Sequence, residues 1–137
     1  MHEPYAYFEH GADIGIVGRG ERIEEAFEQA ATAMFAIMAD PERIRPEVRV
    51  AIEFEEADAE LALVTWLNQL LGQARSRALI FGRFHLRRDG ANWSGTAEGE
   101  SWRAGLERGV EVKGATLTNL AVTARDGIWE ACCVVDV

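Results

Sequence analysis

Asp13 and Asp136 are the residues whose surroundings make them the first candidates for chemistry. Asp13 lies between Ala12 and Ile14 at the start of an expected strand, and Asp136 interrupts the apolar run 131–135. No lysine or arginine is local to either residue. An isolated carboxylate beside buried strands is costly unless it is paired or binds a metal. The two side chains could therefore share a cation across adjacent strands.

The ligand atoms of such a site would be hard oxygens. Carboxylate oxygens favour calcium or magnesium over zinc, and the main-chain oxygens or terminal carboxylate of Val137 could add to the set. The residues alone leave a second interpretation open with equal weight. In that interpretation, Asp136 is an ordinary surface residue at a frayed strand end.

The other candidate residues carry weaker signals. His10 is close to Asp13, in the loop between two expected strands. Lys113 lies in an expected strand with few basic neighbours, where a solvated lysine is the simpler interpretation. Trp93 and Trp102 could stack on a nucleobase, although packing within a hairpin fits them better. None of these residues defines a reaction by itself.

The motifs of nucleotide-binding and zinc-binding proteins are missing from the sequence. It contains no P-loop, no GxGxxG fingerprint, no HExxH and no paired CxxC. The glycine-rich segment 15–20 lacks the P-loop lysine and the required glycine spacing, so it predicts a turn from a strand into a helix. Triphosphate, dinucleotide and zinc-finger functions therefore have no support.

The composition is that of an acidic globular protein. The chain has 137 residues, 48% of them hydrophobic, and a formal net charge of −9, which argues against duplex binding through phosphate contacts. Cys132 and Cys133 are adjacent, so strand geometry disfavours a disulfide and reduced thiols are expected. No signal-peptide pattern and no apolar stretch of membrane-spanning length is visible. We expect a cytoplasmic protein.

The spacing of apolar residues predicts two helices. Residues 21–39 carry apolar side chains three and four apart, which predicts an amphipathic helix that ends ahead of Pro41 and has Glu28 on its solvated face. Asp58 is expected to cap a second helix with Leu61 facing inward.

Alternating apolar residues and Asp-Gly turns predict the strands. The expected strands are 5–9, 14–18, 48–54, 79–87, 93–98, 110–116, 120–125 and 129–137. Helices and strands follow one another in a mixed order, with several hairpins. This order indicates an α+β fold, with a mixed or antiparallel sheet of about six to eight strands and two main helices. We expect a single compact domain over residues 1–137.

Five blocks of the sequence, in order, resemble the archease family. The first, YFEHGADIG at residues 7–15, is similar to the family signature Phe-Glu-His-Thr-Ala-Asp-Ile-Gly. The others are Glu24–Glu28 with the helix exit Met38–Pro41, Trp66–Leu71, Val112–Thr116 and Trp129–Val137. The resemblance covers the whole length, and five ordered blocks are far more specific than any one of them.

The resemblance implies an accessory function. Archeases are small non-catalytic proteins that assist the GTP-dependent RNA-splicing ligase of tRNA splicing, promoting its guanylation and its multiple turnover. RNA would be contacted only through the ligase, and the oligomeric state is left open. The family also implies a divalent metal, calcium in its known structures, with magnesium and manganese as alternatives. Carried over by motif, the ligands would be Asp13, Asp136 and the main chain of Val137.

The resemblance leaves some roles open and is broken in two places. Matching positions that could contact the ligase, its nucleotide or the outer shell of the metal are His10, Asp40 and Lys113. Gly11 replaces the usual threonine, and Leu117 and Thr118 stand where the family has Tyr-His. These departures affect the expected partner surface near Lys113 more than the expected metal site.

Two other classes of function compete with this one. A chaperone-like modulator of nucleic-acid-processing enzymes would act by surface binding without metal, and it predicts an exposed apolar patch. A free-standing metal hydrolase would use Asp13 and Asp136 and turn over a substrate without a partner. The hydrolase ranks last, because the sequence offers no credible nucleophile or general base.

Overall fold

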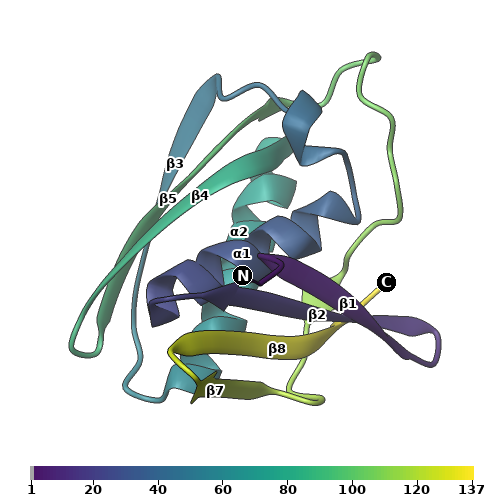
Figure 1. The fold of residues 1–137 in the computed structure, drawn as a ribbon. Helices are drawn as coiled ribbons and strands as arrows, with labels where there is room; N and C mark the ends of the chain where they lie inside the picture. The colour runs from purple at the N-terminus through teal and green to yellow at the C-terminus, as the bar shows by residue number, and fades with distance from the viewer. Residues whose placement is uncertain (1) are drawn as a thin grey trace.

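The strands form two antiparallel sheets in the computed structural model, which describes residues 2–137 (Figure 1). Sheet I has the order β1–β2–β8–β6, with β7 also paired to β8, and sheet II has the order β3–β5–β4. Sheet I contains β1 (Tyr5–His10), β2 (Asp13–Gly20), β6 (Gly114–Ala115), β7 (Ala121–Arg125) and β8 (Ile128–Asp136). Sheet II contains β3 (Val48–Glu55), β4 (Leu79–Asp89) and β5 (Asn92–Ser101). The α+β fold is confirmed, and its strands are divided between two sheets rather than held in one.

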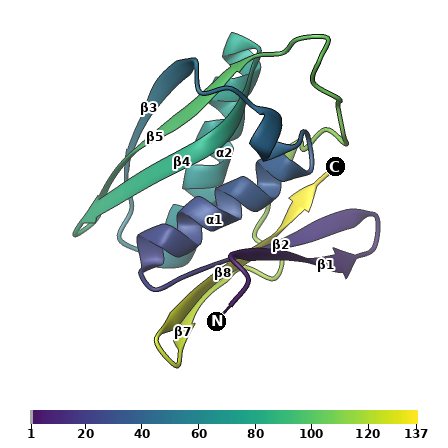
Figure 2. The same cartoon turned by 45° about the horizontal axis from the view of Figure 1, so that its top comes forward.

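Helix α1 (Ile23–Ala36) lies between the two sheets (Figure 2). It contacts β2 and β8 on one side and β4 on the other. Towards sheet I, Gly18 lets β2 approach the backbone of α1 at Ala26 and Ala30. Towards sheet II, Phe35 packs on Phe81 with ring centroids 5.6 Å apart. Because both sides are covered, α1 buries apolar residues around most of its circumference, as a core helix does.

Helix α2 (Ala59–Arg77) is tied to α1 through a buried tryptophan. The indole Nε1–H of Trp66 donates to the backbone oxygen of Phe27 at 3.0 Å. The expected cap is confirmed, because Oδ1 of Asp58 accepts from the N–H of Leu61 at 3.0 Å. The Leu61 side chain, however, is 44% exposed rather than inward. Within residues 2–137, neither helix combines the length and the apolar character that crossing a membrane requires.

The aromatic side chains of sheet II pack inside the molecule. Trp93 is fully buried and stacks on Phe27 of α1 with centroids 4.9 Å apart, and Phe54 stacks on it at 6.0 Å. The interpretation of Trp93 as a packing residue is therefore confirmed. Trp102 is half-buried, with the guanidinium of Arg108 over its ring at 4.0 Å.

The expected strand 110–116 is wrong except for β6. Residues 102–113, called here the 102–113 loop, contain neither helix nor strand. The backbone N–H groups of Gly109 and Val110 donate to the carbonyls of Met38 and Ile37, at 2.8 and 3.1 Å. These bonds attach the loop to the end of α1, so the two N–H groups are satisfied without a neighbouring strand.

Two glutamates are tied to the backbone of other segments. Glu28 is half-buried and accepts from the N–H of Leu86 at 2.8 Å, so its expected place on a solvated face is wrong, and burial raises the pKa of its carboxyl. Glu100 is 2% exposed and accepts from Nε of Arg103 at 2.8 Å and from the N–H of Arg45 at 2.7 Å. The Arg103 bond, followed by the backbone bond, lowers the pKa of Glu100. Glu100 thereby fixes the start of the 102–113 loop to sheet II.

The two cysteines of β8 are free thiols, as expected. Cys133 faces the core, and burial raises the pKa of its thiol to about 12. Cys132 is half-buried, and its thiol pKa is also raised, chiefly by burial. Both thiols therefore stay protonated at neutral pH and are poor nucleophiles.

Candidate functional site

One end of sheet I collects most of the residues that the sequence singles out. His10 pairs with Asp13 across the β1–β2 hairpin, Ile14 pairs with Val135, and Gly114 pairs with Asp136. Since Asp13 precedes Ile14 and Asp136 follows Val135, the antiparallel register continues to Asp13 opposite Asp136. Opposed residues of an antiparallel pair share a face of the sheet. The two aspartates, far apart in sequence, are therefore neighbours at this end of sheet I, which is called here the Asp13–Asp136 edge.

The two carboxylates differ in exposure. Asp13 is half-buried, and its Oδ1 accepts from the backbone N–H of Val137 at 3.3 Å, whereas Asp136 is exposed. Among residues 2–137, no lysine, arginine or histidine forms a salt bridge with either carboxylate. The structure therefore places two acidic groups side by side, and none of the described residues forms an ion pair with either of them.

Lys113 reaches the same edge through its backbone. Its N–H donates to the carbonyl of Asp136 at 2.8 Å, and its side chain is exposed. Asp40 lies elsewhere, where its Oδ1 accepts from the N–H of Glu42 at 3.0 Å and caps the 3-10 helix Pro41–Arg43. The exposed His10 is next to Asp13 in the register, but no three His, Cys, Asp or Glu side chains in the described part of the chain converge as a metal cluster.

Two residues that the sequence analysis missed hold this edge in place. The amide of Asn68 bonds both backbone groups of Ala115, accepting from its N–H at 2.9 Å and donating to its carbonyl at 3.1 Å. Arg75 donates from Nη2 to the carbonyl of Val112 at 2.8 Å and also to that of Lys113. Both residues project from α2 onto β6 and the chain before it. Asn68 lies inside a block that resembles the family, and that was the one signal that could have found it.

Removing the Asn68 amide should loosen β6. In Asn68→Ala, two backbone groups of Ala115 lose their partner, and we expect the free energy of unfolding to fall by about 1–2 kcal/mol. Urea unfolding measures this change. Gln69→Ala is the matched control, since Gln69 is exposed in the same turn and makes no side-chain hydrogen bond among the described residues. Equal losses in the two variants would contradict the stabilisation of β6 by the Asn68 amide.

The departures from the family pattern lie next to this edge. Gly11 has φ +59° in the β1–β2 turn, a conformation that glycine adopts without strain. Leu117 is 64% exposed, and the carbonyl of Thr118 accepts from the N–H of Val134 at 3.0 Å. Leu117 and Thr118, which replace the family's Tyr-His, therefore form part of the surface beside β8.

The donor chemistry at this edge fits a hard divalent cation. Asp13 and Asp136 offer carboxylate oxygens, and the main chain of Val137 is held against Asp13. Calcium accepts six to eight oxygen ligands in flexible geometry, and magnesium keeps several waters. A site open on the Asp136 side leaves room for such waters or for an outside ligand.

The similarity of the chain to known proteins settles its family. The model of the Archease protein family (MTH1598/TM1083) matches residues 5–137. The chain belongs to the archease family. Its resemblance to the family, first indicated by five short blocks, is therefore confirmed over nearly the whole chain.

Relatives with the archease name match almost end to end. The protein archease of Sulfolobus acidocaldarius is 38% identical over 136 residues, covering 97% of this chain and 98% of its own. The protein archease of Methanothermobacter thermautotrophicus is 32% identical over 136 residues, covering 96% of this chain and 97% of its own.

Two solved structures share the fold. The solution structure of Methanobacterium thermoautotrophicum protein 1598 superposes with a TM-score of 0.86 at 29% identity, covering 98% of this chain and 99% of its own. The crystal structure of an archease from Thermotoga maritima, described as a "possible chaperone", gives a TM-score of 0.66 at 21% identity and covers 100% and 98%. At that identity, the second comparison concerns the fold alone.

Proposed function

We propose that this protein is a non-catalytic accessory factor of the GTP-dependent RNA-splicing ligase that acts in tRNA splicing. It promotes guanylation of the ligase and lets each ligase molecule turn over repeatedly. It works with a bound divalent cation, calcium in the first instance, held by Asp13, Asp136 and the main chain of Val137. RNA is contacted only through the ligase.

The observation that carries this proposal is the pair of opposed carboxylates at the end of sheet I. Asp13 and Asp136 are brought together by the β2–β8 register, and no cationic side chain of the described residues compensates them. Membership of the archease family supports the choice of partner. The net charge of −9 adds long-range attraction to the basic RNA-binding face of a ligase.

The chain's own residues have separate tasks in this proposal. The cation, when bound, supplies positive charge that can neutralise phosphate oxygens. The N–H of Val137 orients Asp13 through Oδ1, which leaves Oδ2 for a ligand. Lys113 is anchored to Asp136 by its backbone, so its ammonium starts from the same edge and can contact a phosphate as a point charge. Activation also requires tighter binding to the guanylation-competent state of the ligase than to its other states.

The test is multiple-turnover RNA ligation by the cognate ligase with GTP and a substoichiometric amount of this protein. We expect a large acceleration by the wild type, and at least about tenfold less stimulation by Asp13→Asn and by Asp136→Asn, because each removes a charged ligand. Calorimetric titration with calcium should show the same loss of affinity in both variants.

Asp126→Asn is the matched control. Asp126 is an exposed acid in the β7–β8 turn with φ 53°, a conformation that asparagine tolerates. It removes the same charge away from the site and should stimulate like the wild type. Undiminished stimulation by folded Asp13→Asn and Asp136→Asn would remove the metal-centred version. No stimulation by the wild type would remove the ligase as partner.

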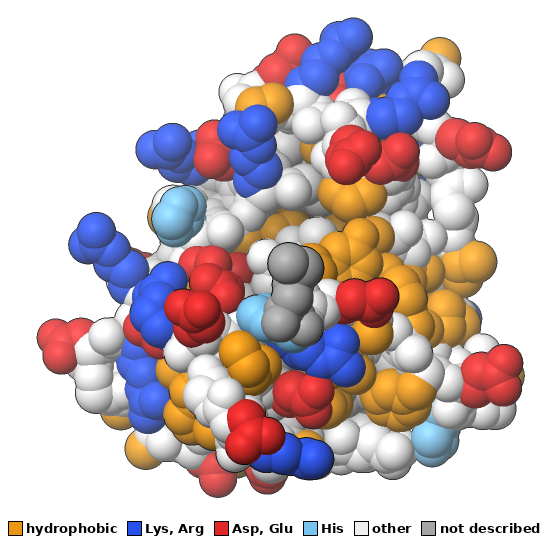
Figure 3. Space-filling model, in the orientation of Figure 1, with side chains coloured by type: hydrophobic (Ala, Val, Ile, Leu, Met, Phe, Trp, Pro, Cys, Tyr) orange, Lys and Arg blue, Asp and Glu red, His pale blue; other side chains and the backbone are white. Residues whose placement is uncertain are grey.

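A chaperone-like factor that acts without metal is the second candidate, and one observation favours it. Hydrophobic side chains gather on the face over β1 and between β1 and the 102–113 loop (Figure 3). A cavity of about 530 Å³ on the protein surface is lined partly by apolar side chains, among them Tyr5, Tyr7, Ile37, Pro41 and Leu106. Such a surface can bind a partner directly.

The aspartate variants separate the two candidates better than a chelator does. Guanylation by GTP needs metal ions of its own, so chelation would stop the ligase whatever this protein does. A metal-free factor predicts full stimulation by Asp13→Asn and Asp136→Asn, and the metal-centred factor predicts its loss.

A further inference from the structure

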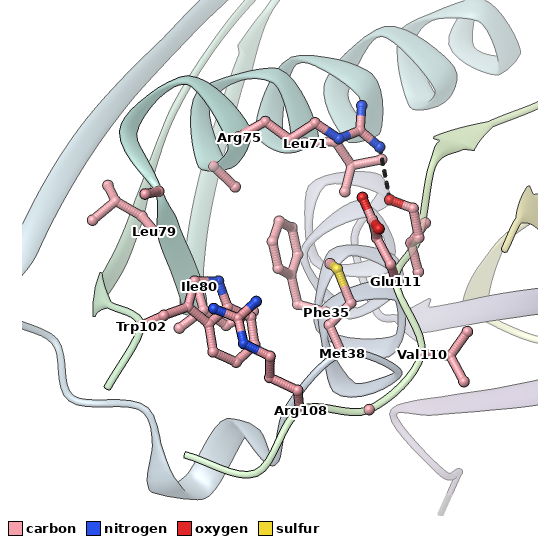
Figure 4. A pocket seen from close by; sticks show the side chains of 14 residues that line it. Phe35, Met38, Leu71, Arg75, Leu79, Ile80, Trp102, Arg108, Val110 and Glu111 are labelled. Atoms are coloured by element: carbon pink, nitrogen blue, oxygen red, sulfur yellow. Dashed lines mark hydrogen bonds between the residues drawn. The ribbon is translucent and has the colours of Figure 1, made fainter. Parts of the chain in front are cut away.

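A cavity of about 410 Å³ lies beneath the 102–113 loop (Figure 4). Its walls come from the end of α1, the C-terminal half of α2, the start of β4 and the loop itself. The apolar side chains lining it include Phe35, Met38, Leu71, Leu79, Ile80 and Val112. This volume falls in the range of small-molecule sites, which are commonly apolar with a few polar groups at fixed places.

The loop is attached at both ends of the cavity. On one side, the N–H of Gly109 donates to Met38 and that of Val110 donates to Ile37. On the other side, Arg75 holds the carbonyl of Val112 at 2.8 Å. Between these attachments the chain passes over the cavity with the Val110 side chain 51% exposed. The cavity is therefore bounded by fixed backbone, and a structureless loop of this length commonly serves a function.

Cationic groups border the apolar lining. Arg108 and Trp102 lie on one side of the cavity, and Arg75 and Glu111 lie on the other (Figure 4). Nη2 of Arg75 donates to the backbone carbonyls of Val112 and Lys113. The guanidinium of Arg108, by contrast, lies over the Trp102 ring and makes no hydrogen bond or salt bridge to residues 2–137. A guanidinium with all its donors free, beside an apolar cavity in an acidic protein, selects an anionic group.

We propose that this cavity binds a small amphipathic carboxylate, with its apolar body against the lining and its carboxylate on Arg108. The apolar body contributes through burial, and the guanidinium selects the sign of the head group. Glu111 disfavours a second negative group on the far side, so the ligand carries a single carboxylate. Neither Asp13 nor Asp136 lines this cavity, although Arg75 contributes both to its wall and to the backbone next to Asp136. The proposal does not depend on the proposed ligase function.

The test uses decanoate as the probe, with decanol and decyltrimethylammonium as comparisons of equal chain length. Calorimetric titration of the full chain should give a Kd on the order of 100 µM for decanoate. Decanol should bind more weakly, and the cationic probe should not bind. Amide NMR shifts should concentrate at Met38, Ile80 and Val112. No binding of decanoate, shifts elsewhere, or equal binding of the cationic probe would overturn the proposal.

Two variants and a control locate the ligand. Arg108→Gln should weaken decanoate about tenfold and leave decanol unchanged, because only the charged contact is lost. Ala74→Leu adds volume to the lining and should prevent binding of both probes. Arg77→Gln removes an exposed charge of the same helix outside the cavity and should bind like the wild type. Unchanged decanoate binding by Arg108→Gln would overturn the assignment, even if Ala74→Leu fails to fold.

Discussion

Replacing Gly18 by alanine is expected to lower the free energy of unfolding by about 3 kcal/mol, because the added methyl overpacks a backbone contact. A Cβ at Gly18 would lie 2.2 Å from the carbonyl oxygen of Ala26 and 2.2 Å from the nitrogen of Ala30. These are backbone atoms of α1, so no side chain can rotate away. The helix would have to move off sheet I along the contact that holds it there.

Urea unfolding followed by circular dichroism measures this loss. Gly72→Ala is the control for a glycine-to-alanine change, since an added Cβ on this exposed face of α2 meets no atom within 4 Å apart from the neighbouring residues and backbone of its own helix. The free energy of unfolding of Gly72→Ala should rise by about 0.5–1 kcal/mol, because alanine loses less backbone entropy than glycine when it is fixed in a helix. A Gly18→Ala protein as stable as the wild type would show that α1 and β2 do not pack as closely as described.

Replacing Trp66 by alanine is expected to cost about 4 kcal/mol of unfolding free energy, the usual range for a large buried aromatic. The side chain is fully buried, and its Nε1–H is bonded to the Phe27 carbonyl at 3.0 Å. The variant leaves a cavity at the junction of α1, α2 and sheet II and removes the bond between the helices. We expect it to unfold at a much lower urea concentration than the wild type.

Trp66→Phe separates packing from hydrogen bonding. Phenylalanine keeps most of the apolar volume but has no N–H to donate, so we expect a loss of about 1–2 kcal/mol. An equal loss in the alanine and phenylalanine variants would mean that the hydrogen bond rather than the packing determines the cost.

The helices and strands could be predicted from local patterns, and the errors occur where tertiary contacts determine which side chains are buried or hydrogen-bonded. Asp58 caps α2 as expected, because a cap depends only on the next few residues. The spacing of apolar residues predicts an inward Leu61, whereas the turn that faces the core buries Ala62 and Leu63. The helical pattern predicts Glu28 in solvent, yet β4 supplies an N–H donor that no helical pattern reveals.

At the candidate site, too, local features could be predicted from the sequence, and features that depend on tertiary contacts could not. The isolation of Asp13 and Asp136 among apolar residues was visible in the sequence, but their proximity depends on the β2–β8 register. Asn68 and Arg75 were missed because a side chain that binds a distant backbone leaves no periodic signal. Asp40 matched the family pattern, and the structure places it in the cap of a 3-10 helix instead of beside the two aspartates.

The central place of β8 in sheet I also determines the order in which the strands can pair. Ile14 pairs with Val135, and Gly20 pairs with Trp129, so β2 can complete its pairing in sheet I only after β8, which follows all the other described strands in the chain, has been synthesised. Sheet II uses only residues 48–101 and can pair earlier. Until then, β2 presents an open edge, the arrangement most prone to association with other chains. The end of sheet I that holds the two aspartates can therefore form only after the strands of sheet II have been synthesised.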